Sequence, residues 1–225
     1  AETKCSAFLK ENPTHTYAMS LLAEIANRFG YFDDAEFLLQ KAVEFKPKDG
    51  DLRLKYASIL RKKQKFAQTT EQVNILCDQF PDNLNYQAQK ASDVMQGGDH
   101  SKAITMFDDI LKKNPYNFST LTSKGHAQKT LGSTDQAIKS YQSAYQIKPD
   151  HGEAFFSLAN LKTYSFSDYE LDSMRQQVER VDLSLREKAF FHFALAQSFE
   201  VAGKFDEAFF HFDKGNKIKN DQSQY

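Results

Sequence analysis

The stretch "ILKKNPYN", residues 110–117, decides the fold through the position of its proline. Pro115 lies 34 residues after one proline and 34 residues before another. The remaining prolines continue the same spacing, so that all five form one series: Pro13, Pro47, Pro81, Pro115 and Pro149. A fixed period of about 20–50 residues is typical of repeat proteins, in which each period is one supersecondary unit. The sequence therefore predicts a repeat architecture with a 34-residue unit.

Other residue types recur with the same 34-residue period. We number each unit so that its proline is at position 32. Position 8 carries Ala23, Ala57, Ala91, Gly125 and Ala159. Position 20 carries Ala1, Ala35, Thr69, Ala103 and Ala137, with one misfit at the threonine, and position 15 carries Gly30, Gln64, Gly98 and Gly132. Glycine tolerates the left-handed conformation that ends a helix, and proline ends a helix because it lacks an amide hydrogen. Each unit therefore predicts two helices whose axes approach closely at the small residues.

This pattern resembles the tetratricopeptide repeat, a 34-residue helical hairpin with small residues at positions 8 and 20, glycine near 15 and proline at 32. The resemblance implies an all-α fold in which stacked antiparallel helix pairs wind into a right-handed superhelix with a concave surface. We expect a single array over residues 1–220, followed by a tail at 221–225. Its parts are a half repeat at 1–15, regular repeats at 16–49, 50–83, 84–117 and 118–151, an irregular repeat at 152–188 and a final repeat at 189–220.

The irregular repeat follows the last proline of the series. Ala196 takes the place of a position-8 residue 37 residues after Ala159, so three residues are inserted between these two units. In the inserted region we expect a helix from Asp168 to about Val181 in place of a regular second helix. Ser184, followed three residues later by Glu187, predicts a capping box for the next helix.

Composition excludes several classes of function. The chain has 29 basic and 30 acidic residues, so no strong positive field indicates nucleic acid or an anionic membrane as a partner. No apolar run approaches the roughly 20 residues that span a bilayer. Cys5 and Cys77 are too few for a disulfide framework, which favours a reducing, cytoplasmic location. We find no glycine-rich phosphate loop, nucleophile elbow or metal-spaced His/Cys set, and so expect no catalytic residue, metal or cofactor.

The resemblance also implies where a ligand binds. In this family the concave groove is lined mainly by first-helix positions 2, 5, 9 and 12, and a protein or peptide is the partner. Here the candidate groove residues are Tyr17, Ser20, Glu24, Asn27, Leu54, Ser58, Arg61, Asn85, Ser92, Thr122, His126, Lys129, Phe156 and Asn160. The alternative is that these are simply exposed helix faces with no dedicated ligand. Aromatic anchors often dominate binding energy, which singles out Tyr17 and Phe156.

One variant of the family clamps the C-terminal carboxylate of a peptide, with lysine at position 5 and asparagine at position 9. The corresponding pairs in this chain are Ser20 with Glu24, Leu54 with Ser58, and Thr122 with His126. We therefore expect no carboxylate clamp and no binding of chaperone tails.

A narrower resemblance begins at "AFFSLANLKTYSFSD", residues 154–168, and continues in "FHFALAQSFEVAGKFDEAFFHFDKGNKIK", residues 191–219. These stretches are similar to the repeat region of bacterial proteins that join tetratricopeptide repeats to a C-terminal sulfotransferase domain. The resemblance implies that this chain is the non-catalytic arm of a longer protein. An arm that selects substrates for another transferase, such as a glycosyltransferase, is the alternative, and a third possibility is that the chain is itself an enzyme.

Phenylalanine is abundant in the final repeat, more so than one buried stripe on each helix requires. Phe209 and Phe210 are the rings that we expect to contact a following domain or a second copy of the chain. In the alternative arrangement, the irregular helix around Leu171 and Met174 folds over them.

Overall fold

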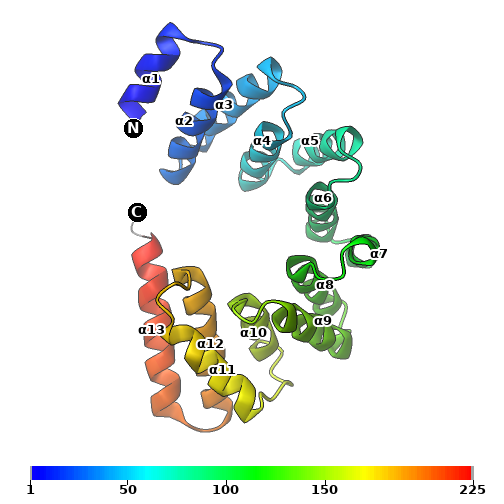
Figure 1. The fold of residues 1–225 in the computed structure, drawn as a ribbon, viewed down its shortest axis with the longest axis vertical. Coiled ribbons are helices and arrows are strands. Elements are labelled where there is room, and N and C mark those ends of the chain that lie inside the picture. Colours follow the sequence, from blue (N-terminus) through cyan, green and yellow to red (C-terminus); the bar gives the residue numbers. More distant parts are fainter. Residues whose placement is uncertain (1, 224–225) are drawn as a thin grey trace. The chain divides into compact units, whose positions relative to one another are not determined.

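The structure is a computed structural model that describes residues 2–223. Ala1 of the position-20 column and residues 224–225 of the expected tail lie outside this range. All regular elements within 2–223 are α-helices (Figure 1), which confirms the all-α fold class. The first six are α1 (Glu2–Glu11), α2 (Thr16–Arg28), α3 (Phe32–Phe45), α4 (Gly50–Lys62), α5 (Phe66–Gln79) and α6 (Leu84–Gln96). The others are α7 (His100–Lys113), α8 (Phe118–Thr130), α9 (Thr134–Ile147), α10 (Gly152–Ala159), α11 (Asp168–Glu179), α12 (Leu185–Val201) and α13 (Phe205–Ser223).

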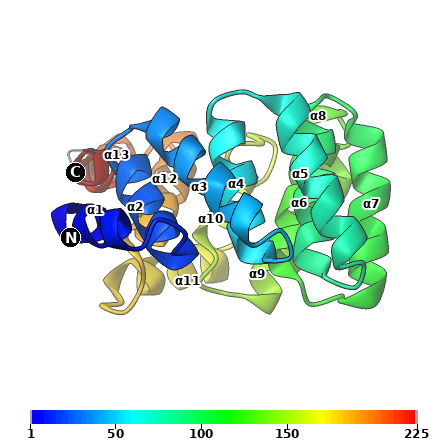
Figure 2. The same ribbon diagram turned by 90° about the horizontal axis from the view of Figure 1, so that it is seen from above.

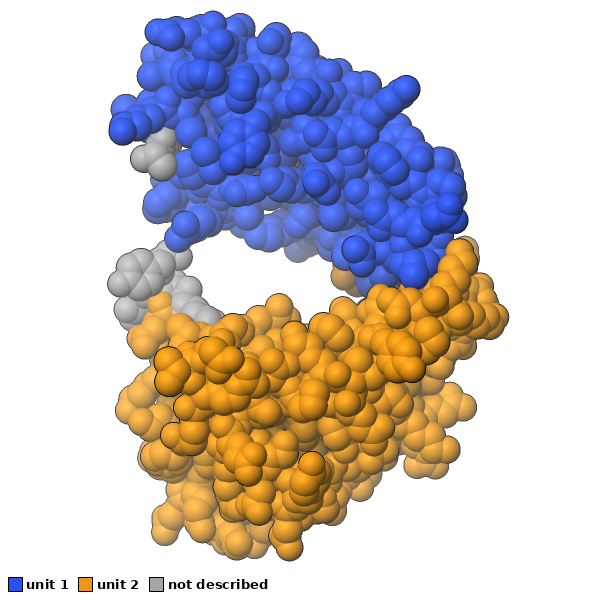
Figure 3. Space-filling view, in the orientation of Figure 1, with its two compact units in different colours: residues 1–93 blue, residues 94–225 orange. Residues whose placement is uncertain are grey.

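The chain divides into two compact units, residues 1–93 and 94–225 (Figure 3). In the first unit α2 packs on α3 and α4 packs on α5, each pair forming a helical hairpin (Figure 2). In the second unit the same relation joins α8 to α9 and α12 to α13. The boundary falls inside α6, and the single continuous array over residues 1–220 stays a prediction.

The helix ends lie where glycine and proline place them. Gly30, Gly98, Gly132 and Gly203 all have positive φ, between 73° and 93°, and each lies two residues after the end of a first helix. Each proline of the series likewise lies two residues after the end of a helix, from α1 to α9. The positions predicted for these breaks from the sequence are therefore confirmed.

Close approach between helices explains the small-residue columns. Ala91, Ala103 and Ala137 are completely buried. Gly125 shows how little space remains at position 8, because a Cβ atom built on it would lie 2.5 Å from the Tyr141 ring. The misfit at position 20, Thr69, is 2% exposed, and its hydroxyl donates a hydrogen bond to the Lys65 carbonyl one turn earlier. A buried polar group is tolerated there because its hydrogen bond is satisfied.

The irregular region departs from the expected boundaries. α11 ends at Glu179, two residues before Val181. It begins with a complete capping box in which Ser167 and Glu170 bond to each other's backbone amides, a feature that the sequence analysis did not single out.

The capping box predicted at Ser184 and Glu187 is only half formed. Ser184 accepts a hydrogen bond from the Glu187 amide, but the Glu187 carboxylate accepts from the Gly152 amide at 2.6 Å instead of turning back to its own helix start. The prediction was wrong in this respect because Gly152, the first residue of α10, packs directly on this turn: a Cβ there would lie 2.7 Å from the Glu187 carbonyl oxygen.

Gln64 occupies the glycine column with φ of 57°, a conformation that costs an ordinary residue about 1 kcal/mol. We expect Gln64→Gly to raise the free energy of unfolding by about 0.5 kcal/mol, since glycine relieves this strain but loses more backbone entropy on folding. Urea denaturation measures the change. Gln79→Gly is the control: Gln79 is the last residue of α5, and glycine at a helical position should lower the free energy of unfolding. A lower free energy of unfolding in both variants would contradict the expectation.

Candidate functional site

Lysines from the following repeat occupy much of the first-helix face in the first unit. Lys55 of α4 donates to the Ser20 hydroxyl at 2.9 Å and also forms an ion pair with Glu24. Lys62 donates to the Asn27 side-chain oxygen at 2.7 Å. Lys55 and Lys62 thus contact the candidate residues at positions 5, 9 and 12 of the first regular repeat. The sequence analysis did not identify these two lysines. The two lysines occupy positions 6 and 13 of their repeat, each one residue after a groove position (5 or 12).

A second connection joins α4 to α6. Arg61 donates from Nε to Asp93 at 2.8 Å, and its side chain and that of Asp93 are 21% and 11% exposed. Burial raises the pKa of the Asp93 carboxyl, and the adjacent guanidinium opposes this effect. Arg61 is therefore already ion-paired within the first unit. The other candidates there differ in exposure: Tyr17, Ser58 and Asn85 are exposed, and Leu54 and Ser92 are half-buried.

A hydrogen-bonded network centred on His126 occupies the corresponding face of the second unit. The His126 Nδ1 atom lies 2.9 Å from the Tyr141 hydroxyl, and its Nε2 lies 3.4 Å from Glu153. Arg186 approaches the same carboxylate at 3.2 Å. The hydrogen bond from His126 is the main cause that lowers the pKa of Glu153, whereas burial raises the pKa of the Tyr141 hydroxyl. The network connects α8, α9, α10 and α12.

Two further candidates in this unit are held by neighbours that the sequence did not single out. Thr122 is buried, and its hydroxyl lies 3.0 Å from His151 Nε2. Asn160 accepts a hydrogen bond from the Gln197 side chain at 3.0 Å. Lys129 is exposed. These pairs join successive first helices, α10 to α12 in the case of Asn160, so several predicted ligand contacts also serve packing between repeats.

Aromatic rings and a cation meet beside this network. The half-buried Phe156 ring lies 5.5 Å from that of Phe190 and 5.9 Å from that of Phe193. The Arg186 guanidinium lies over the Phe190 ring at 5.5 Å. We call these four residues the Phe156 patch. Phe190 is half-buried like Phe156, whereas Phe193 is buried beneath them. A partly exposed ring next to a cation can contact both apolar and acidic groups of a partner.

Phe209 and Phe210 lie uncovered on α13, with 72% and 54% of their surfaces exposed. α11 does not cover them, because its Met174 is buried in a core with Phe199 of α12. The alternative arrangement considered from the sequence is therefore wrong for these two rings. Their contact with another domain or copy stays a prediction.

His192 and His211 form a pair in the final repeat. The Nδ1 atoms of His192 and His211 lie 2.9 Å apart between α12 and α13. Within residues 2–223 no group of three or more His, Cys, Asp or Glu side chains is arranged to hold a metal ion. Burial lowers the pKa of His192 to about 4, and nearby positive charges add to this effect. Burial lowers the pKa of His211 as well.

None of the helices in the described part of the chain combines the length and the apolar composition that crossing a membrane requires.

Comparison with known proteins identifies the repeat. Residues 118–151 match the tetratricopeptide repeat family. The structure resembles that of MamA (AMB-1), with a TM-score of 0.50, 21% identity and coverage of 90% of this chain and 98% of that one. It also resembles YrrB, described as a TPR protein with an unusual peptide-binding site, with a TM-score of 0.53, 11% identity and coverage of 98% and 95%. The helical-repeat fold is thus like that of a tetratricopeptide-repeat protein.

Two longer proteins are related in sequence. The DnaJ protein P58IPK homolog of Arabidopsis thaliana is 28% identical over 181 residues, which cover 72% of this chain and 38% of that protein. The human Protein O-mannosyl-transferase TMTC1 is 23% identical over 148 residues, 64% of this chain and 17% of that protein. The chain therefore spans about two fifths of the first relative and about a sixth of the second.

The histidine pair gives a testable pH dependence. Because the pKa of His192 is lower in the folded than in the unfolded chain, the unfolded state binds more protons between about pH 6.5 and 4. The contribution of His192 to folding stability should thus be fully present above about pH 6.5 and fall by about 3 kcal/mol as the pH drops through this window. Urea titrations at several pH values should show a shallower decline for His192→Asn. His100→Asn, at the start of α7, is the control, and an equal decline in wild type and His192→Asn would contradict the assignment.

Proposed function

We propose that this chain is a non-catalytic interaction module that binds a protein or peptide on the face of its first helices. The observation that carries the proposal is the Phe156 patch, where the half-buried rings of Phe156 and Phe190 and a 68%-exposed Arg186 side chain converge on that face. The Arg186 guanidinium also pairs with Glu153 of this chain at 3.2 Å, which orders it beside the aromatic rings. Such groups are enriched at protein interfaces, where a ring fills a pocket and a guanidinium pairs with a carboxylate.

The neighbouring hydrogen bonds give this face a fixed shape. Glu153 contacts both His126 and Arg186, and His126 also contacts Tyr141. Asn160 accepts a hydrogen bond from Gln197. A partner would therefore meet side chains that are already ordered, which reduces the conformational entropy lost on binding. The peptide-binding site named for YrrB supports a peptide as the ligand class, by analogy of fold.

The chemistry of the face does not favour chaperone tails. A carboxylate clamp needs lysine and asparagine side chains that are free to bind an anion. In the first unit the corresponding positions carry Ser20 and Glu24, and both bond to Lys55. We therefore infer that a peptide ending in acidic residues, such as a chaperone tail, is not the ligand. This inference stands although one relative is by name a DnaJ protein.

We further propose that the chain is the arm of a larger, cytoplasmic transferase, with Phe209 and Phe210 contacting a following domain or a second copy. The sulfotransferase assignment is supported by the resemblance of residues 154–168 and 191–219 to repeat regions of such proteins. A glycosyltransferase is the second candidate, and one observation favours it: a relative covering 64% of this chain is by name a mannosyl-transferase. The two unpaired cysteines, Cys5 and Cys77, favour the cytoplasm.

Substitution of Phe156 tests the binding face. Peptides selected from a random display library on the wild-type chain should bind Phe156→Ala at least about tenfold more weakly, because truncating a buried aromatic anchor commonly costs 2 kcal/mol or more. Lys139→Ala, on the second helix α9 and exposed, is the matched control and should bind as the wild type does. Failure to select any peptide, or equal weakening by both variants, would contradict the proposed face. Calorimetry measures the affinities.

Assays with activated donors test the transferase assignment. The isolated chain should transfer neither sulfate nor mannose, whereas the full-length protein should transfer sulfate from a sulfate-donor nucleotide to an acceptor protein. Transfer of mannose by the full-length protein would favour the second candidate. If the full-length protein transfers neither group, both transferase assignments fail, and the result leaves the peptide-binding measurement above unaffected.

A further inference from the structure

A pocket of about 270 Å³ lies in the second unit, where the irregular repeat meets α12. One side of it is the C-terminal part of α12, from Gln197 to Ala202. The other side is formed by the end of α10, the loop that follows it and the first turn of α11. We call it the α10–α12 pocket. All of its lining residues lie within 159–202.

The pocket exists because α10 is short. This helix has 8 residues, whereas the regular first helices α2, α4, α6 and α8 have 13 each. In the first unit the residue at position 13 of one repeat contacts position 12 of the preceding repeat, as Lys62 does with Asn27. Val201 also stands at position 13, but the preceding position-12 residue is Thr163, in the loop beyond the end of α10. Val201 therefore stays 75% exposed in the wall of the pocket.

The polar groups in the lining are largely satisfied within the chain. The hydroxyl of Tyr164 lies 2.5 Å from the Glu170 carboxylate, and that of Ser198 donates to the Ala194 carbonyl at 2.7 Å. The Gln197 amide donates to Asn160 at 3.0 Å. What the pocket offers a ligand is mainly carbon surface.

The apolar part of the lining has a fixed shape. Phe166 and Leu171 both pack against the core that contains Phe155 and Met174, so their positions are set before any ligand binds. The volume of about 270 Å³ lies just below the roughly 300–1,000 Å³ of pockets for drug-sized ligands. The pocket therefore suits one large apolar side chain of a peptide.

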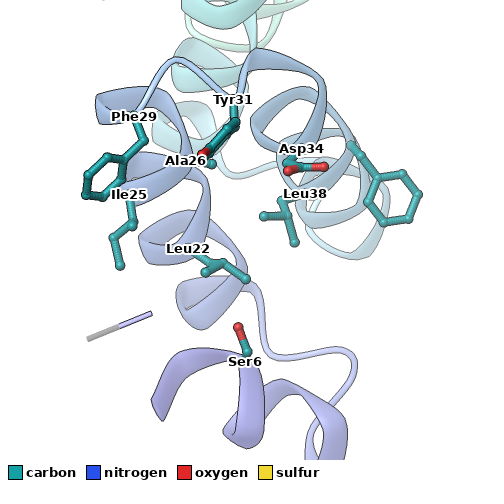
Figure 4. A pocket seen from close by; sticks show the side chains of 9 residues that line it. Ser6, Leu22, Ile25, Ala26, Phe29, Tyr31, Asp34 and Leu38 are labelled. Carbon is teal, nitrogen blue, oxygen red and sulfur yellow. The ribbon is translucent and has the colours of Figure 1, made fainter. Parts of the chain in front are cut away.

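One hydrogen bond connects the pocket to the candidate binding face. Gln197 lines the pocket, and its partner Asn160 is a candidate groove residue. Phe193 of the Phe156 patch precedes Gln197 by four residues, and Val201 follows it by four, so all three lie along one side of α12. A pocket of the same volume between α1, α2 and α3 (Figure 4) has no such connection, because among the described residues no side chain that lines it is hydrogen-bonded to a candidate groove residue.

We infer, as an extension that rests on the proposed function, that a peptide bound at the Phe156 patch places a second apolar side chain in the α10–α12 pocket. Phe193 and Val201 are eight residues apart in α12, which corresponds to about 12 Å at 1.5 Å per residue. An extended peptide advances about 3.3 Å per residue and directs residues i and i+4 to the same side. Two apolar residues four positions apart in an extended peptide therefore match the two sites.

The groups between the two sites favour this extended form. Apart from the bond that joins them, the Gln197 side-chain oxygen and the Asn160 side-chain nitrogen have no hydrogen bond in the described part of the chain. One acceptor and one donor thus remain for a ligand. An extended backbone offers N–H and C=O groups to such a pair, whereas in a helix these groups are bonded to each other.

Peptide selection tests the spacing. Peptides selected on the wild-type chain from a random 12-residue display library should carry two large apolar residues four positions apart. Replacing either of them by serine should weaken binding at least about tenfold in calorimetry. A spacing of seven or eight, as in a helix, or full affinity with one apolar residue alone, would overturn the inference.

Variants of two exposed valines locate the second residue. Val201→Asp puts a carboxylate in the wall of the pocket and should weaken binding of the selected peptides about tenfold. Val181→Asp is the matched control, since Val181 is 96% exposed and does not line the pocket, and it should bind as the wild type does. One of the two serine-substituted peptides should bind Val201→Asp and the wild type equally, which completes a double-mutant cycle. Circular dichroism checks that both variants keep the fold.

Failure of this inference and failure of the proposed function give different results. If Phe156→Ala weakens binding but Val201→Asp and Val181→Asp bind as the wild type does, the pocket is not used and the binding face stands. If no peptide is selected, or if Phe156→Ala binds as the wild type does, the proposed binding face fails and the second anchor fails with it. Equal weakening by Val201→Asp and Val181→Asp would also overturn the role of the pocket.

Discussion

The structure depends on close contact between helices at the small residues of each repeat. Position 8 of the repeat at 118–151 illustrates the constraint, because Gly125 faces the Tyr141 ring with no room for a Cβ atom. Tyr141 is buried there and directs its hydroxyl to His126. A larger residue at position 8 would therefore displace both a core ring and a residue of the candidate binding face. Packing and the geometry of the candidate site are coupled through this contact.

The periodic pattern of the sequence predicted the fold to within a few residues, because its signals are local. A glycine at positive φ or a proline acts on its own turn of the chain, and its effect does not depend on what packs against it. The half-formed capping box at Ser184 and Glu187 shows the limit of such reasoning. Glu187 bonds to Gly152, 35 residues earlier in the chain, and no local pattern reveals that this amide is within reach.

The candidate site was less predictable for the same reason. Family positions identified which residues occupy the first-helix face, but not their partners on the next repeat. Lys55 and Lys62 contact three of the candidates in the first unit from positions that the family pattern does not include. A search of neighbouring units for charges opposite in sign would have found the pairing of Glu24 with Lys55. It would not have found the Phe156 patch, which depends on where the inserted residues place α12.

The ion pairs of the first-helix face also affect how fast a partner can arrive. Arg61 with Asp93, Lys55 with Glu24, and Arg186 with Glu153 each cancel one charge against its neighbour. A face neutralised in this way produces little long-range field, so encounter with a ligand proceeds without electrostatic steering. Association rates would then lie near the 10⁵–10⁶ M⁻¹s⁻¹ typical of unsteered docking and would change little with ionic strength.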